Sequence, residues 1–182
     1  MLTILAGMLT LVLLPALPDA PARAHTTQNN IMNATKPSDR EIVLTQTFAA
    51  PRQAVFDALT QTNHLLRWMQ PTHMSLVSCE VDLRAGGSFR YVFQRPSGAR
   101  IEVRGAFETV DPPRRLVYKE SYDFSPLELR VTTVLDEAGG ETVFTQTIRY
   151  SSKQERDDDF EPVATSAAEV YAKLERYLKS PR

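Results

Sequence analysis

Six strand-like stretches separated by short turns constrain this chain more than any other feature of its sequence. They span residues 74–83, 88–94, 100–110, 115–122, 127–135 and 142–150. Turn signals such as Gly86-Gly87, Pro112-Pro113 and Gly139-Gly140 stand between them. Parallel neighbours need crossover connections of a dozen or more residues, so turns this short permit only antiparallel pairs. The sequence therefore predicts an antiparallel meander.

The segment before the meander predicts one more strand and two short helices. Residues 41–48 alternate apolar and polar side chains, which is typical of a strand. A short helix follows from Pro51, because proline suits the first turn of a helix. A second helix spans 62–68 and is stopped by Pro71.

The segment after the meander, 153–178, carries an apolar stripe at helical spacing and predicts a long helix. Pro162 is interpreted as part of its first turn, with 154–159 as a separate short turn. The predicted fold class is α+β. A curved seven-stranded antiparallel sheet surrounds the long C-terminal helix, and two short helices follow the first strand.

The alternation of side chains along each strand, its parity, predicts one apolar and one solvent-exposed face of the sheet. Phe89, Tyr91 and Phe93 point one way, whereas Arg90 points the other. The C-terminal helix has the stripe to cover the apolar face. Its first half presents small residues around Ala167, and large residues begin at Tyr171. We therefore expect a cavity under the alanines and a solid core from Tyr171 onward.

The residues expected to line this cavity come from the second short helix, the middle strands and the C-terminal helix. The alternative is that these aromatic side chains fill the space completely and are ordinary core. The predicted ligand-binding residues are Trp68, Phe89, Tyr91, Phe93, Phe107, Tyr118, Glu120, Tyr122, Ala164, Ala167 and Ala168.

No catalytic residue is assigned. The candidate for such a role is Glu120, because parity places this acid on the apolar face. A buried glutamate beside Tyr118 and Tyr122 has the features of a general base. The alternatives are that Glu120 lies near a strand end and is solvated, or that a bulge shifts the parity of the strand. His73 and Cys79 are further candidates, but their spacing supports no metal site, and we expect none.

Charge and cysteine usage exclude several classes of protein. The net charge is −1, from 21 basic and 22 acidic residues, whereas nucleic-acid binding needs a clustered positive surface. The single cysteine, Cys79, permits no intrachain disulfide and is expected to be a small buried hydrophobe. No glycine-rich phosphate loop or metal-ligand cluster is present, so we expect no cofactor. The balanced charge predicts no nucleic-acid partner.

The N-terminus has two interpretations. Residues 1–24 resemble a signal peptide, with Ala22-Arg23-Ala24 as the cleavage site, although no Lys or Arg precedes the apolar run. Alternatively, translation starts at Met32 and the upstream segment is not part of the protein. The apolar run is too short to span a membrane, so the processed protein is not expected to be integral to one. Residues 25–39 are interpreted as a disordered linker and 40–180 as the domain. The location is periplasmic or secreted in the first case and cytoplasmic in the second.

Five local motifs in this order resemble the START-like, or SRPBCC, superfamily. Residues 48–56 are similar to its opening strand and helix, and 65–68 with Pro71 to its helix ending in Trp-Trp-Gly-Pro. Residues 79–87 resemble its Asp-x-Arg-x-Gly-Gly hairpin. Residues 110–118 resemble its Pro-x-Arg-Leu strand entry, and 150–157 its lead into the final helix. The branch most similar is that of bacterial proteins related to the activator of heat shock protein 90 ATPase.

This resemblance implies a helix-grip fold with a hydrophobic ligand cavity. It does not imply one activity, because the fold hosts lipid carriers, hormone receptors, cyclases and co-chaperone domains. Met69-Gln70 stands where Trp-Gly is usual, and the final helix lacks the usual Gly-Met-Glu-x-Gly. We expect a protein that binds a small hydrophobic or amphipathic ligand. The alternatives are a co-chaperone-like protein-interaction domain and a cyclase- or hydrolase-type enzyme using the same cavity.

The two interpretations of the N-terminus are separated by sequencing the mature protein from its host. Export predicts a processed product that begins just after Ala24, with a longer precursor. A product that begins at Met32 with no longer precursor would contradict export.

Overall fold

The computed structural model describes residues 32–71 and 73–180. In these residues eight strands form one antiparallel sheet, in the order β1-β2-β8-β7-β6-β5-β4-β3. The elements are β1 Asn33–Ser38, β2 Glu41–Phe48, α1 Arg52–Thr60, α2 Thr62–Trp68, β3 Ser75–Val81, β4 Ser88–Gln94, β5 Arg100–Asp111, β6 Arg115–Tyr122, β7 Ser125–Ala138, β8 Glu141–Arg149 and α3 Lys153–Lys179. The predicted helix-grip fold is confirmed, with eight strands instead of seven.

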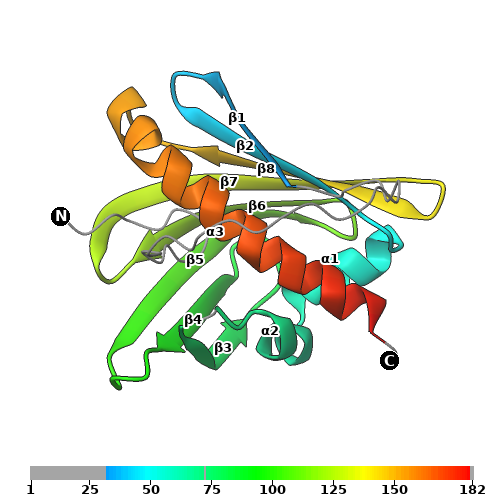
Figure 1. Cartoon of the computed structure of the whole chain (residues 1–182), viewed down its shortest axis with the longest axis horizontal. Coiled ribbons are helices and arrows are strands. Elements are labelled where there is room, and N and C mark those ends of the chain that lie inside the picture. The colour runs from blue at the N-terminus through cyan, green and yellow to red at the C-terminus, as the bar shows by residue number, and fades with distance from the viewer. Residues whose placement is uncertain (1–31, 72, 181–182) are drawn as a thin grey trace, which may run out of the picture.

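Helix α3 lies across one face of the curved sheet. Helices α1 and α2 lie near the C-terminal end of α3 (Figure 1). The helix begins at the N-cap Ser152, whose hydroxyl accepts a hydrogen bond from the Glu155 amide. Its buried stripe includes Val163, Val170 and Leu174. Because these residues recur at helical spacing, one continuous side of α3 covers the apolar face of the sheet.

The strand parity predicted from the sequence is observed in the burial of alternate residues. Phe89, Phe93 and Phe107 are 4%, 1% and 6% exposed, respectively, on the inner face. Arg104 and Lys119 are exposed on the outer face. Antiparallel pairing keeps residues of one parity on one side across neighbouring strands, so the inner face is continuous.

Strand β1 corrects two expectations: the count of seven strands and the inclusion of 33–38 in a disordered linker. Residues 25–31 of that predicted linker lie outside the described residues. Residues 33–38 pair with β2 at the edge of the sheet, with an irregular register between Thr35 and Ser38. Their polar, proline-containing sequence carries no strand pattern, and proline is tolerated there because β1 is an edge strand. The strand is therefore formed by its partners in the tertiary structure.

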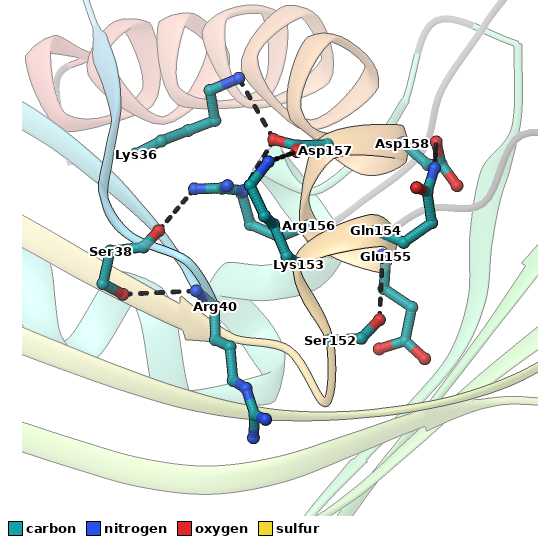
Figure 2. A network of polar contacts seen from close by, with 10 residues as sticks. All are labelled: Lys36, Ser38, Arg40, Ser152, Lys153, Gln154, Glu155, Arg156, Asp157 and Asp158. Carbon is teal, nitrogen blue, oxygen red and sulfur yellow. Dashed lines mark hydrogen bonds and ion pairs between the residues drawn. The ribbon is translucent and has the colours of Figure 1, made fainter.

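Contacts with the start of α3 hold β1 in place, as Figure 2 shows. The Arg156 guanidinium donates a hydrogen bond to the Ser38 carbonyl oxygen. Lys36 Nζ lies 3.4 Å from Asp157 Oδ1 and 4.6 Å from the centre of the Phe160 ring. These contacts join two segments that are more than a hundred residues apart in sequence.

Helix α3 also runs unbroken through Pro162, where a separate first turn was expected. An interior proline removes one backbone hydrogen bond and costs about 3 kcal/mol. The helix persists because apolar and polar contacts continue on both sides of the proline. Val163 is 1% exposed, and the Tyr150 hydroxyl donates a 2.8 Å hydrogen bond to Asp159 Oδ2.

The segment interpreted as a signal peptide, residues 1–24, lies outside the described residues. Among the helices that the structure does describe, none is long and apolar enough to cross a membrane.

The observed parity predicts opposite outcomes for two aspartate substitutions on β5. Phe107→Asp should abolish folding, because burying an unpaired charge costs several kcal/mol. Arg104→Asp should cost about 1 kcal/mol or less, because this side chain is exposed and surface ion pairs contribute little. Urea unfolding followed by circular dichroism measures both. Similar behaviour of the two variants would mean that the strand register is wrong.

Candidate functional site

A cavity of about 90 Å³ lies between the inner face of the sheet and the helices that cover it. Its walls come from all three helices and from strands β3 to β8. The apolar lining residues are Leu59, Leu65, Trp68, Met69, Val81, Phe89, Phe93, Val103, Phe107, Leu116 and Phe144. The polar ones are Thr60, Tyr91, Tyr118, Glu120, Thr133, Gln146 and Tyr171.

The structure brings seven of the residues predicted from the sequence together around this cavity. Six of them come from neighbouring strands β4, β5 and β6, and one comes from the end of α2. That they contact a ligand stays a prediction. The seven residues are Trp68, Phe89, Tyr91, Phe93, Phe107, Tyr118 and Glu120.

The three alanines of α3 do not line the cavity, which corrects its predicted position. Ala167 is 1% exposed and belongs to the packed core, Ala164 is half-buried, and Ala168 is exposed. Successive residues of a helix differ by about 100° in direction, so Ala168 turns away from the face that Ala167 occupies. The small side chain of Ala167 lets the helix pack closely at this point. The contribution of α3 to the lining is Tyr171, where solid core was expected.

Tyr171 begins a chain of buried polar contacts inside the cavity. Its hydroxyl donates a 3.0 Å hydrogen bond to Gln146 Oε1. Gln146 Nε2 lies 3.4 Å from the Tyr118 hydroxyl and 3.5 Å from Thr133 Oγ1. The chain therefore links α3 to β8, β7 and β6 through side chains that would be costly to bury alone.

Gln146 and Thr133 were not identified from the sequence, although a signal was present for Gln146. It stands between Phe144 and Ile148 at the inward parity of β8, and all three are buried. A polar residue at a core position of an alternating strand indicates a buried hydrogen-bonding site. Thr133 has no such signal, because threonine is common at any strand position.

Glu120 lies on β6 and is 8% exposed. The alternative that its side chain is solvated is therefore wrong. The Tyr122 hydroxyl donates a hydrogen bond to Glu120 Oε1. Tyr122 itself, which was predicted to bind the ligand, is not one of the residues that line the cavity. On the neighbouring strands, Glu120 stands opposite Gly105 and Leu129. An acid is thus held on a predominantly apolar sheet face.

Gly105 makes room for an aromatic cluster beside this acid. A Cβ atom at Gly105 would lie 2.1 Å from Phe89 Cζ, so any side chain there would displace the ring. The Phe89 ring stacks on Tyr91 with 4.9 Å between centroids. Its centroid lies 5.4 Å from that of Phe107 and 5.3 Å from that of Tyr118. Aromatic faces and edges therefore form one wall of the cavity next to Glu120.

The negative charge of Glu120 acts on the tyrosines around it. Burial raises the pKa of Tyr91, and the Cys79 and Glu120 charges raise it further. Burial, followed by the charge of Glu120, also raises the pKa of Tyr118 and of Tyr171. These three hydroxyls stay protonated at neutral pH and can donate hydrogen bonds.

The remaining candidates lie away from the cavity wall. Cys79 is half-buried on β3, and burial raises the pKa of its thiol, so the reactive thiolate is disfavoured. His73 is exposed. Among the residues of 32–71 and 73–180, no group of three or more His, Cys, Asp or Glu side chains is arranged to hold a metal ion.

Comparison with known proteins identifies one matching family model. Residues 49–179 match the model described as activator of Hsp90 ATPase homolog 1-like protein. The matched range contains all of the cavity lining and excludes β1 and β2. The comparison with curated proteins found no match.

Solved structures of bacterial proteins share this architecture. A Rhodobacter sphaeroides protein is 26% identical with a TM-score of 0.78, covering 81% of this chain and 97% of its own. A Nitrosomonas europaea protein is 25% identical with a TM-score of 0.70, and the match covers 78% of this chain and 95% of that protein. A Staphylococcus epidermidis protein is 26% identical with a TM-score of 0.68, and the match covers 81% of this chain and 95% of that protein. The similarity thus extends over nearly the whole of each relative.

The raised pKa values predict how the cavity tyrosines respond to alkali. Because their folded-state pKa lies above the unfolded value of about 10, the stability they contribute is complete below pH 10 and is lost as pH rises above it. Tyr91, Tyr118 and Tyr171 should therefore form phenolate only as the domain unfolds. Absorbance at 295 nm and far-ultraviolet circular dichroism, followed together, measure this.

Tyr171→Phe is the control for this titration and should reduce the absorbance step that coincides with unfolding. Complete ionisation of all tyrosines near pH 10, with the circular dichroism signal intact, would contradict the burial of these hydroxyls.

Proposed function

Because this chain belongs to the family of activator of Hsp90 ATPase homolog 1-like proteins, we propose that it binds a small apolar or amphipathic ligand in the cavity under α2 and α3. The fold supports ligand-binding domains in general, and the particular ligand depends on the site of each protein. The observation that carries the proposal is a cavity with apolar walls and a few convergent polar groups, which is typical of small-molecule sites.

The size of the cavity limits the ligand. Its volume of about 90 Å³ is smaller than the roughly 150 Å³ of an apolar cavity that holds benzene. A single ring therefore requires one lining side chain to move. Met69 suits this role, because it lines the cavity at the end of α2 and its unbranched side chain repacks easily. The proposed ligand is accordingly no larger than one substituted ring.

The polar groups of the cavity supply orientation. Gln146, Tyr118 and Tyr171 form a hydrogen-bonded chain on one side, and the Glu120 carboxylate stands on β6. An amphipathic ligand would place its ring against the aromatic wall formed by Phe89 and Phe107. Its polar end would then meet groups that are already held in place, which lowers the entropic cost of binding.

The two alternatives to a binding protein are a cyclase- or hydrolase-type enzyme and a co-chaperone-like interaction domain. The enzyme would use the same cavity with Glu120 as general base, so ligand binding precedes it and is tested first. The interaction domain requires no occupied cavity, so an interior that takes up no small molecule favours it.

A cavity-filling substitution tests the proposal with toluene as the probe. Val103 lines the cavity from β5, and Val103→Phe should abolish toluene binding at a stability cost of about 1–3 kcal/mol. In the unchanged protein, toluene at ten times its Kd should stabilise the fold by about 1.4 kcal/mol. This corresponds to a rise in Tm of about 3–6 °C, measured by thermal unfolding.

The matched control is Ala106→Phe, which adds a ring to an exposed position of the same strand. It should leave toluene binding unchanged. Native mass spectrometry of protein purified from its host complements the test by looking for a co-purified small molecule. If toluene leaves the Tm of the unchanged protein where it is and no molecule co-purifies, the proposed function is wrong.

A further inference from the structure

The ionisable side chains that line the cavity include an acid but no base. Glu120 is an acid, and none of the lining residues is Lys, Arg or His. The acid stands in the middle of the lining strands, where β6 pairs with β5 and β7. Charge in the cavity therefore comes from a single carboxyl group among apolar side chains, hydroxyl groups and the amide of Gln146.

The carboxylate is oriented by the protein. The Tyr122 hydroxyl donates to Glu120 Oε1 from the same strand, two residues away. An ionised carboxylate offers about four acceptor positions, so it can accept a ligand donor in addition to this hydroxyl. An acceptor held in this way favours a ligand that donates a hydrogen bond at a defined point.

The space next to Glu120 suits the edge of a ring. Gly105, its neighbour on β5, has no side chain, and the Phe89 ring lies over that glycine. Phe107 and Tyr118 extend the aromatic wall, with 6.1 Å between their centroids. A ring stacked on this wall would carry its substituent towards the carboxylate.

The electrostatic effect of Glu120 extends across the cavity. Beyond the effect of burial, its charge contributes to the raised pKa of Tyr91, on β4, and of Tyr171, on α3. These side chains belong to elements on different sides of the cavity. A ligand that brings its own negative charge next to Glu120 would be opposed by this carboxylate.

We propose that the ligand is a small ring compound bearing a hydrogen-bond donor, an ammonium or a hydroxyl group, which binds the Glu120 carboxylate, and that carboxylate-bearing ligands are rejected. This inference rests on the proposed function, because it assigns the ligand class of the same cavity. It excludes fatty acids and other anionic amphiphiles as ligands. A ligand group that only accepts hydrogen bonds cannot replace the donor, because it and the Glu120 carboxylate would present lone pairs to each other.

Four single-ring probes of similar size test the inference by isothermal titration calorimetry: toluene, phenol, benzylamine and benzoate. Phenol and benzylamine should bind about ten-fold or more tightly than toluene, which is the effect expected of one hydrogen bond to a charged group. Benzoate should bind more weakly than toluene. The comparison uses the protein as it exists and needs no variant.

Glu120→Gln identifies the residue responsible. The glutamine keeps a carbonyl oxygen that can accept from Tyr122, but it removes the charge. The preference for benzylamine over toluene should fall to about three-fold or less, and benzoate should no longer be rejected. The matched control is Glu128→Gln, which removes the same charge from an exposed position on β7 and should alter none of these ratios.

The possible results separate this inference from the proposed function. If toluene binds but phenol and benzylamine bind no better, or if benzoate binds best, the donor-bearing ligand class is wrong while the cavity function stands. If none of the four probes binds, the proposed function fails and the inference fails with it. If Glu120→Gln does not fold, the four probes on the unchanged protein still decide the ligand class.

Discussion

The packing of Tyr171 against the sheet is the contact on which the rest of the structure depends. Its ring lies 4.7 Å from that of Phe144 and 6.4 Å from that of Phe48, measured between centroids. Its hydroxyl donates to Gln146 at the same time. One side of this residue therefore belongs to the solid core and the other to the cavity. The position of Tyr171 on α3 decides where close packing ends.

The cavity combines two arrangements that are costly separately. A buried acid requires hydrogen-bond donors, and Tyr122 supplies one to Glu120. An aromatic cluster requires space on the sheet, and Gly105 supplies it for Phe89. Because both lie at the same point of β5 and β6, the sheet presents an apolar wall and a charged acceptor within reach of one small molecule. This combination underlies both the proposed function and the ligand class inferred from it.

The two ends of α3 are held by different kinds of contact. At the N-terminal end, Arg156 and Asp157 bind the edge strand β1 through hydrogen bonds and ion pairs (Figure 2). At the other end, Lys173 donates a 2.6 Å hydrogen bond to the Gln70 carbonyl oxygen, just after α2. Polar contacts thus position the helix along its length, whereas apolar contacts hold it against the sheet.

The sequence by itself determined the order of the elements, the antiparallel meander and the inward direction of Glu120. These follow from alternation, turn residues and helical spacing, which are local properties of the chain. The strands 88–94 and 115–122 and the helix 62–68 have the predicted bounds. Seven predicted residues, from Trp68 to Glu120, meet at the cavity because parity places strand residues correctly.

Only the tertiary structure decided where the helix stands above the sheet. Side-chain size alone predicted a cavity under Ala167, but small residues let two surfaces approach as readily as they leave a gap, and here they approach. Strand β1 and the unbroken passage of α3 through Pro162 likewise depend on partners far away in sequence. Local preference is worth about 1–3 kcal/mol at such positions, and the burial of a whole helix face outweighs it.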